Sequence, residues 1–276
     1  MSTDALPAAA ASLRQLMDMR GRVSLITGGA GHIGSVMAEA LAELGSSLVI
    51  LDLDEGRCAA VAGMLRERYG IDTLACPTNL GDDEAVSRLR QRVEDRFGRL
   101  DVLVNVAALV GTSSLQGWST AFERQRLDVW RDALNINLTA PFVLAQAFAL
   151  LLKTSGHGSI VNVSSIYGVV GPDWRLYEGT ALGNAAAYSA SKGGLLQLSR
   201  WLATTLAPEI RVNSITPGGV FRDTPEPFLS RYVSRTPLKR MASEQDLKGA
   251  IAYLASDLSA YVTGHNLVVD GGWTAW

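Results

Sequence analysis

The sequence predicts one doubly wound α/β domain, with a parallel sheet of seven strands and helices on both faces of that sheet. Short apolar runs alternate with longer helical patterns along almost the whole chain, which is the order of elements in such domains. Most of the apolar runs are continuous rather than alternating, as in strands that are buried on both faces. The chain has 276 residues, of which 47% are hydrophobic, so it is long enough for one large core.

Seven strands and six helices are predicted, each from the length and pattern of its apolar residues. The predicted strands are, in chain order, 23–27, 47–52, 72–76, 100–106, 158–164, 210–216 and 266–270. The predicted helices are 33–44, 55–69, 82–97, 129–152, 186–206 and 243–255. Two stretches, 168–185 and 218–236, are expected to be loops at carboxyl ends of strands, where ligands of such sheets bind. Residues 1–20 are expected to form a short lead-in, and residues 21–276 the single folded domain.

The composition excludes several classes of function. The formal net charge is −2 with no long run of one sign, which speaks against binding to nucleic acid or to an acidic membrane surface. Cys58 and Cys76 lack the spacing of a metal or redox motif and the three histidines are scattered, so no metal site is expected. A transmembrane helix is not expected, and Asp4 and Arg14 interrupt what would otherwise resemble a signal peptide. The expected protein is cytoplasmic, with a small molecule as its partner.

A glycine-rich turn, residues 27–34, follows the first predicted strand and opens a helix. Backbone N–H groups at a helix start attract an anion, and glycines let it approach closely, so the arrangement is typical of a dinucleotide phosphate site. The second predicted strand ends in Asp52, at about the distance along the chain from Gly28 expected for a carboxylate that binds the adenosine ribose. An ordinary role for Asp52 as a turn residue or helix cap stays open.

Tyr188 and Lys192 lie at positions i and i+4 at the start of a predicted helix, so their side chains share one face. A free tyrosine has a pKa of about 10, and a nearby ammonium group is expected to lower the pKa of Tyr188 toward the physiological range. Such a phenol suits general acid–base catalysis. Ser164 and Ser165 close a predicted strand, where a hydroxyl can hold a carbonyl oxygen. The Tyr-x-x-x-Lys spacing alone is common, so its meaning depends on the other motifs.

Taken together, these motifs resemble those of the short-chain dehydrogenase/reductase family, from about Arg20 to the C-terminus. The turn 27–34 is similar to the Thr-Gly-x-x-x-Gly-x-Gly cofactor turn of that family. The other segments that carry the resemblance follow in the family's order: Asn105-Val106-Ala107-Ala108, Asn135-Ile136-Asn137-Leu138, Ser164-Ser165-x-x-Gly168, Tyr188-x-x-x-Lys192, Pro217-Gly218 and the stretch 256–273. The resemblance implies that residues 21–276 are a single Rossmann-fold catalytic domain that binds a nicotinamide dinucleotide.

The resemblance also implies the roles of four catalytic residues. Tyr188 is the general acid or base that passes a proton to or from the substrate oxygen. Ser165 hydrogen-bonds that oxygen, and it is preferred to Ser164 because it directly precedes the turn 166–168. Lys192 binds the nicotinamide ribose and lowers the pKa of Tyr188, and Asn137 holds a water molecule that relays protons through Lys192. Hydride passes between the substrate carbon and the nicotinamide, which is the cofactor's own chemistry.

The implied cofactor contacts lie at several strand ends. Asn79 and Leu80 flank the adenine, although the family usually has Asp where Asn79 stands, and Asn105 and Ala107 line the adenosine and the ribose. The backbone of Val220 is expected to hold the carboxamide. The complete set of expected cofactor-binding residues is Gly28, Gly31, His32, Ile33, Gly34, Asp52, Asn79, Leu80, Asn105, Ala107, Tyr188, Lys192, Pro217, Gly218 and Val220.

Three departures from the family pattern affect the cofactor site. His32 replaces the middle glycine of the turn, so either the turn is shifted, or His32 contacts phosphate, or its side chain points outward. Ala108 replaces the last glycine of its motif. Arg222 stands where the family often has a threonine that binds the carboxamide, with Thr224 close by.

The expected function is NAD(H)-dependent interconversion of an alcohol and a ketone. Asp52 repels a 2′-phosphate, and Gly31 stands where NADP-binding relatives often have a basic residue, so no cation is expected near that phosphate. Two alternatives are a 3-oxoacyl carrier-protein reductase, which would favour NADP(H), and a non-catalytic nucleotide-binding scaffold. The expected substrate is a sugar, a polyol or a sugar-derived hydroxyl compound, by overall similarity rather than from any motif.

Two further expectations concern assembly and substrate choice. The helices 129–152 and 186–206 are apolar on more than one face, and family members pair them between subunits, so a homotetramer is expected, with a dimer as the alternative. The apolar residues concerned are Phe142, Leu144, Phe148, Leu151, Leu195, Leu198, Trp201 and Leu202. The loop 168–185 is expected to form a wall of the substrate pocket, or else a surface insertion against a neighbouring subunit. The candidate contacts in this loop are Trp174, Arg175, Tyr177 and Glu178.

Overall fold

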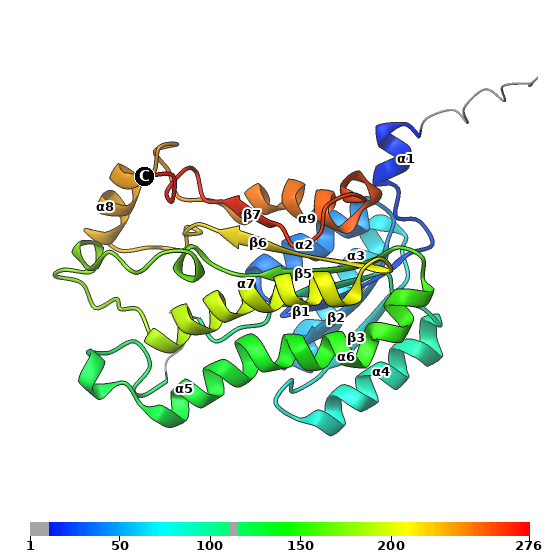
Figure 1. Ribbon diagram of the computed structural model, residues 1–276, viewed down its shortest axis with the longest axis horizontal. Coiled ribbons are helices and arrows are strands. Elements are labelled where there is room, and N and C mark those ends of the chain that lie inside the picture. Colours follow the sequence, from blue (N-terminus) through cyan, green and yellow to red (C-terminus); the bar gives the residue numbers. More distant parts are fainter. Residues whose placement is uncertain (1–10, 111–114) are drawn as a thin grey trace, which may run out of the picture.

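Seven parallel strands form one sheet in the computed structural model, which describes residues 11–110 and 115–276 (Figure 1). Their order across the sheet is β3-β2-β1-β4-β5-β6-β7, so the direction of progression reverses between β1 and β4. The strands are β1 (Val23–Thr27), β2 (Ser47–Asp52), β3 (Thr73–Pro77), β4 (Val102–Asn105), β5 (Gly158–Val163), β6 (Ile210–Pro217) and β7 (Asn266–Val269). In such sheets a ligand binds beyond the carboxyl ends of the strands at the point of reversal.

Helices cover both faces of the sheet (Figure 1). One face carries α2 (His32–Glu43), α3 (Glu55–Tyr69) and α9 (Lys248–Ala255), and the other carries α4 (Asp83–Phe97), α6 (Ala140–Thr154) and α7 (Ala186–Leu206). Neighbouring strand residues serve opposite faces: Leu25 packs in the core under α4, α6 and α7, whereas Ile26 packs in the core under α2, α3 and α9. The predicted doubly wound architecture, with its seven-stranded parallel sheet, is confirmed.

All seven predicted strands are present, with bounds that differ by one or two residues at most. The long helix predicted at 129–152 is instead α5 (Leu127–Leu134), a π-helical turn (Asn135–Thr139) and α6. Pro141 explains the interruption, because it has no N–H for the carbonyl of Asn137 four residues earlier and the regular ladder cannot continue. The interruption therefore falls on the segment that carries an expected catalytic residue.

The expected N-terminal lead-in is partly built into the domain. Leu13–Met17 form the short helix α1, which Ser12 caps, and Met19 is fully buried. The N–H of Met19 donates to the carbonyl of Leu44, at the end of α2, at 2.9 Å. Residues 1–10 of the expected lead-in lie outside the described residues.

The two helices expected to be apolar on more than one face keep most of those side chains in their own core. Trp201 and Leu150 point outward, 53% and 60% exposed. Most of the other apolar side chains are buried or half-buried: Phe142, Leu144, Phe148, Leu151, Leu195, Leu198 and Leu202. Within the described residues, the continuous stretch Leu127–Thr154 is long and apolar enough to cross a membrane. Its buried side chains pack against the sheet, as those of a core helix do.

We expect Gly34→Ala to destabilise the chain and Gly63→Ala not to do so. A Cβ atom at Gly34, in α2, would lie 2.0 Å from the carbonyl oxygen of Gly28, and overpacking of this kind costs about 1–3 kcal/mol. A Cβ atom at Gly63, in α3, would meet no described atom within 4 Å, and alanine favours a helix. Thermal unfolding should therefore show a Tm several degrees lower for Gly34→Ala only. Equal Tm values for the two variants would contradict the close approach at Gly34.

Candidate active site

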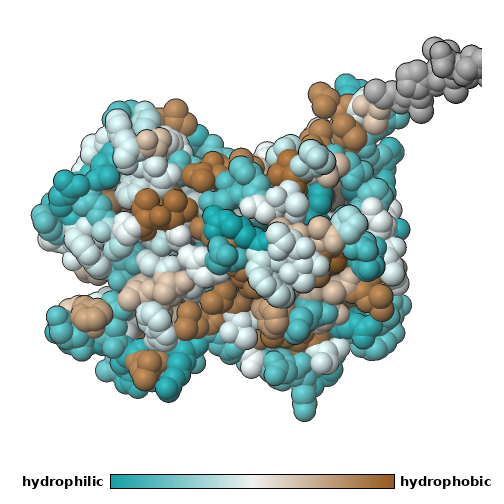
Figure 2. Space-filling view, viewed as in Figure 1, coloured by the Kyte–Doolittle hydropathy of each residue, from teal (hydrophilic) through white to brown (hydrophobic). Residues whose placement is uncertain are grey.

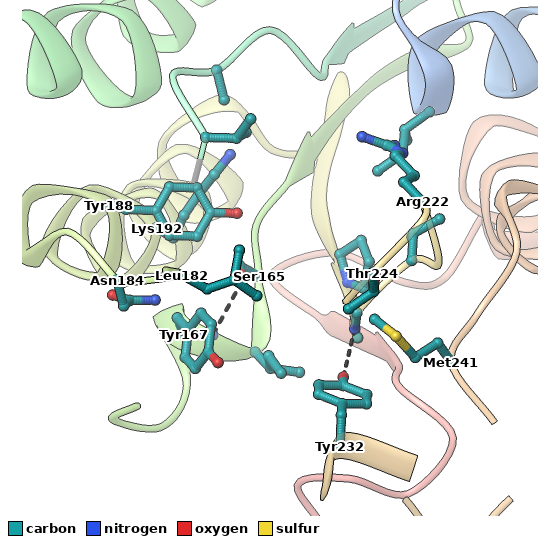
Figure 3. Close-up of a pocket in the computed structure, with 18 of the residues that line it drawn as sticks. Ser165, Tyr167, Leu182, Asn184, Tyr188, Lys192, Arg222, Thr224, Tyr232 and Met241 are labelled. Atoms are coloured by element: carbon teal, nitrogen blue, oxygen red, sulfur yellow. Dashed lines mark hydrogen bonds between the residues drawn. The ribbon is translucent and has the colours of Figure 1, made fainter. Parts of the chain in front are cut away.

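A cavity of about 350 Å³ lies at the carboxyl edge of the sheet, where the central strands end (Figure 3). Its lining includes Val106 after β4, Ser165 after β5 and Gly218 after β6. Tyr188 and Lys192 enter it from the start of α7. The surface is hollowed between the part of the molecule that carries α8 (Phe228–Arg235) and the part that carries α5 (Figure 2). Three of the four residues expected to be catalytic, Ser165, Tyr188 and Lys192, therefore share the site predicted by the topology, whereas Asn137 does not line the cavity.

The glycine turn is packed so tightly that side chains are excluded at two of its positions. Gly28 has φ +63°, and a Cβ atom there would lie 3.0 Å from the Cα of Ala107. The Cβ contact at Gly34 already described closes the other side of the turn. Thr27 Oγ1 accepts hydrogen bonds from the N–H groups of Val106 and Ala107 at 3.0 and 3.1 Å. The bare backbone at the start of α2 thus fits the approach of a dinucleotide phosphate.

His32 does not distort this turn. Gly31 is the N-cap of α2 with φ −83° and ψ 172°, and His32 follows as the first helical residue, in the ordinary right-handed conformation of α2. The side chain of His32 is exposed. The exposed side chain favours the interpretation in which His32 points outward.

The carboxylate of Asp52 and the guanidinium of Arg57 both contact the backbone of Ala30. Asp52 Oδ2 accepts a hydrogen bond from the N–H of Ala30 at 3.2 Å, and Oδ1 accepts one from Leu53 at 2.8 Å. Arg57 Nη2 donates to the carbonyl of Ala30 at 2.6 Å. The expectation that no cation lies here is wrong, because the first turn of α3 brings Arg57 back toward the end of β2.

The expected adenine contacts follow β3, next to the end of β2. The N–H of Thr78 donates to the carbonyl of Asp52 at 2.8 Å, which places Asn79 and Leu80 beside that strand end. Asn79 Oδ1 accepts a hydrogen bond from Gly81 at 3.0 Å, and Leu80 is 9% exposed. Asn79 and Leu80 therefore lie beside the end of β2, where the adenosine is expected, and outside the lining of the cavity.

Asn105, at the end of β4, is buried and its side chain links β4 to β5. Its Nδ2 donates to Asn162 Oδ1 at 2.8 Å, across to β5. Asn105 Oδ1 is buried and has no hydrogen-bond partner among the described residues. An unpaired buried amide oxygen at a strand end is consistent with a polar ligand there.

The two adjacent serines after β5 have different surroundings. Ser164 Oγ donates to the carbonyl of Lys192, on α7, at 2.9 Å and is 4% exposed. Ser165 Oγ accepts a hydrogen bond from the N–H of Tyr167 at 3.2 Å and also interacts with the phenol of Tyr188. The geometry therefore favours Ser165, and not Ser164, as the hydroxyl next to the reacting oxygen.

Burial dominates the electrostatics of Tyr188 and Lys192. Burial raises the pKa of Tyr188, and the hydrogen bond with Ser165 opposes this effect only in part. Burial lowers the pKa of Lys192 to about 8. Lys192 Nζ lies 5.9 Å from the ring centroid of Tyr188 and donates to the carbonyl of Val163 at 2.7 Å. The expected lowering of the pKa of Tyr188 by Lys192 is thus wrong for this structure, because burial is the largest effect on this pKa and Lys192 does not contribute to it.

Asn137 lies in the π-helical turn and is fully buried. Its Oδ1 accepts a hydrogen bond from the N–H of Leu109 at 2.8 Å, and its Nδ2 donates to the carbonyl of Leu109 at 3.1 Å and to Ser191 Oγ at 3.0 Å. The amide of Asn137 thus joins the segment after β4 to α7. Asn137 therefore lies against α7 and outside the lining of the cavity, and its amide holds two segments of the site together.

The loop 168–185 contributes to the cavity wall, although mostly through residues other than those expected. Tyr177, Leu182 and Asn184 line the cavity. Trp174 is 56% exposed and lines a neighbouring groove, and Arg175 is paired with Asp173 at 2.8 Å on the surface. Glu178 also lines only that groove. Trp174, Arg175 and Glu178 therefore lie outside the lining of the cavity itself, because the short helical turn Trp174–Leu176 buries Leu176, and the groove of Trp174 and Glu178 shares Tyr177, Leu182 and Asn184 with the cavity.

Helix α8 supplies pocket residues that the sequence analysis missed. Phe228 and Tyr232 line the cavity, and the hydroxyl of Tyr232 accepts a hydrogen bond from the N–H of Gly219 at 2.5 Å. Burial raises the pKa of Tyr232 to about 12. The spacing of two aromatic residues at i and i+4 is a helical signal, but Pro225 and Pro227 made the segment resemble a loop.

The segment after β6 lies against the same cavity. Pro217, Gly218 and Val220 line it, together with Arg222 and Thr224. Val220 pairs with Ala242 in an isolated bridge, which holds the backbone of this segment in place. The expected cofactor residues Pro217, Gly218 and Val220 therefore line the same cavity as Tyr188 and Lys192.

Comparison with known proteins identifies the family of the chain. The family model described as enoyl-(acyl carrier protein) reductase matches residues 28–274. The chain is 36% identical over 263 residues to the cis-4-hydroxycyclohexanecarboxylate dehydrogenase of Sinomonas cyclohexanicum, with 92% of this chain and 97% of that protein covered.

Solved structures resemble the chain over nearly its whole length. A gluconate 5-dehydrogenase from Burkholderia cenocepacia J2315, in complex with NADP and tartrate, has a TM-score of 0.85 at 28% identity, covering 96% of this chain and 100% of that one. An NAD⁺-bound xylitol dehydrogenase has a TM-score of 0.81 at 29% identity, covering 92% and 99%. Both the sequence matches and the shared architecture show that this chain belongs to the short-chain dehydrogenase/reductase family, whose members are oxidoreductases acting on hydroxyl groups.

Proposed function

We propose that the chain is a cytoplasmic, NAD(H)-dependent oxidoreductase that interconverts an alcohol and a ketone on a sugar, a polyol or a related hydroxylated compound. The observation that carries the proposal is that Ser165, Tyr188 and Lys192 line one cavity. Ile33, from the glycine turn at the start of α2, lines the same cavity. Acid–base groups and a phosphate cradle within one cavity are the arrangement that hydride transfer from a dinucleotide requires.

The residues of the chain account for the proton in this reaction. A bound nicotinamide dinucleotide supplies the hydride acceptor or donor. Because burial raises its pKa, the phenol of Tyr188 is protonated at neutral pH and can donate a proton to the oxygen of a ketone. Ser165 holds that oxygen with its hydroxyl, and Lys192 binds the ribose beside the phenol. Oxidation of an alcohol requires Tyr188 to lose its proton first, so this direction is favoured at alkaline pH.

The lining of the cavity supports a compact hydroxylated substrate. Tyr177 and Phe228 offer flat apolar faces, with ring centroids 5.2 Å apart. The hydroxyls of Tyr167 and Tyr177 lie 2.6 Å apart, and Asn184 adds an amide to the same wall. The relatives named above act on a hydroxycyclohexane acid, gluconate and xylitol, which are ring-shaped or polyhydroxylated compounds of this size.

A homotetramer remains the proposed assembly. Trp201 on α7 and Leu150 on α6 are large apolar side chains that the chain itself leaves exposed. Apolar side chains of this size on neighbouring helices support a second subunit against that face.

We expect Tyr188→Phe to lower kcat strongly while leaving dinucleotide binding intact. The variant keeps the ring and removes the only proposed proton donor, so kcat should fall at least about a hundredfold. The matched control is Tyr261→Phe, because Tyr261 is fully exposed. The absorbance of the reduced nicotinamide should be followed with a panel of polyols, sugar acids and hydroxycyclohexane acids. Activity retained by Tyr188→Phe, with a normal response of the control, would show that the assigned role is wrong.

We expect the wild-type chain to bind NAD⁺ at least about tenfold more tightly than NADP⁺. This ratio corresponds to a difference in binding free energy of about 1.4 kcal/mol. The carboxylate of Asp52 accepts hydrogen bonds from ribose hydroxyls and repels a 2′-phosphate. Asp52→Asn should narrow the ratio of the two dissociation constants, because Arg57 then remains beside the phosphate position. Calorimetry with Asp95→Asn, an exposed carboxylate on α4, provides the control. Comparable dissociation constants of the wild type for the two dinucleotides would defeat the proposed preference.

A further inference from the structure

The charged side chains that line the cavity with Tyr188 are all positive among the described residues. The lining contains two cations, Lys192 and Arg222, and no carboxylate in the part of the chain that the structure describes. Lys192 is deeply buried, and its ammonium group already donates to the carbonyl of Val163. Arg222 is therefore the cation that faces the open space of the cavity. A guanidinium in such a position attracts an anionic group.

Arg222 is held in place by one side of its guanidinium. Its Nε donates to Glu244 Oε1 at 3.1 Å, and its side chain is 35% exposed. Within residues 11–110 and 115–276, neither Nη atom of Arg222 has a hydrogen-bond partner. The backbone around it is fixed, because the N–H of Ala242 donates to the carbonyl of Gly219 and the N–H of Phe221 to the carbonyl of Ala242. Arg222 thus presents two oriented, unpaired donors toward the cavity.

Arg222 lines the same cavity as the first turn of α2, where the phosphates of a dinucleotide are expected to bind. Figure 3 shows Arg222 on the wall opposite Tyr188 and Lys192, next to the helix that follows the glycine turn. Ile33, in the first turn of α2, lines the same cavity as Arg222. An anion at the N-terminus of α2 would meet backbone N–H groups of the helix, beside the part of the cavity that Arg222 lines.

We propose that Arg222 binds the pyrophosphate of the dinucleotide, as the side-chain half of a phosphate site whose other half is the backbone of the glycine turn. This inference rests on the proposed function, since it names a contact of the same cofactor. Two parallel N–H donors match two oxygens of a phosphate group. A carboxylate on the substrate has the same chemistry, but Figure 3 shows Arg222 beside α2 and across the cavity from Tyr167 and Asn184.

The test compares the binding of ligand fragments to the wild type, Arg222→Ala and Arg222→Lys by calorimetry. NAD⁺ and ADP-ribose both contain the pyrophosphate, whereas adenosine contains no phosphate. We expect Arg222→Ala to raise the dissociation constants of NAD⁺ and ADP-ribose at least about tenfold and to leave that of adenosine unchanged. Arg222→Lys keeps the charge without the paired donors. Its dissociation constants for NAD⁺ and ADP-ribose should therefore lie between those of the wild type and those of Arg222→Ala. The matched control is Arg68→Ala, which also removes an exposed guanidinium paired with a glutamate but lies at the far end of α3.

Each outcome separates the possible roles of Arg222. Weaker binding of NAD⁺ with unchanged binding of ADP-ribose would place Arg222 on the nicotinamide and overturn the proposal. Unchanged binding of both, with a higher KM for an acidic substrate alone, would assign Arg222 to a substrate carboxylate and overturn it as well. A wild type that binds neither dinucleotide nor ADP-ribose would overturn the proposed function itself. Circular dichroism of Arg222→Ala checks that the variant is folded.

Discussion

The close approach of α7 to the turn after β5 is the constraint on which the candidate active site depends. A Cβ atom at Gly168 would lie 2.7 Å from the carbonyl carbon of Lys192 and 2.8 Å from Ser164 Oγ, so only glycine fits between the turn and the helix. Two hydrogen bonds cross this contact. Ser164 Oγ donates to the carbonyl of Lys192, on α7, and Lys192 Nζ donates to the carbonyl of Val163, at the end of β5. Because the helix is held this close, Ser165 and Tyr188 face the same cavity.

On the side where the cofactor is expected, backbone segments also approach each other closely with no side chain between them. Gly28 approaches Ala107, and Thr27 Oγ1 accepts hydrogen bonds from the N–H groups that follow β4. Asn137 provides the link between the two sides, since its amide hydrogen-bonds Leu109 after β4 and Ser191 on α7. Side chains that satisfy one another's buried polar groups fix the positions of neighbouring strand ends.

The sequence predicted what depends on local pattern. The strands, the glycine turn and the pair Tyr188 and Lys192 follow from periodicity and fixed spacing, and the structure brings them together. Features that depend on packing between distant segments were not predictable in this way. Arg57 reaches Ala30 only because α3 folds back on β2, and the pKa of Tyr188 follows from burial rather than from its neighbour four positions away. The loop 168–185 was correctly placed at the pocket, but a short helical turn decides which of its side chains enter it.

The adjacent serines after β5 have different tasks in the proposed reaction: Ser164 holds α7 through the carbonyl of Lys192, and Ser165 binds the reacting oxygen. Thermal unfolding and steady-state kinetics of Ser164→Ala and Ser165→Ala test this assignment most directly. Loss of one buried hydrogen bond costs about 1 kcal/mol, so Ser164→Ala should lower the Tm by roughly 2–4 °C and keep most of kcat. Ser165→Ala should keep the Tm and lose at least about a hundredfold in kcat. A large loss of kcat confined to Ser164→Ala, with Ser165→Ala fully active, would contradict the account.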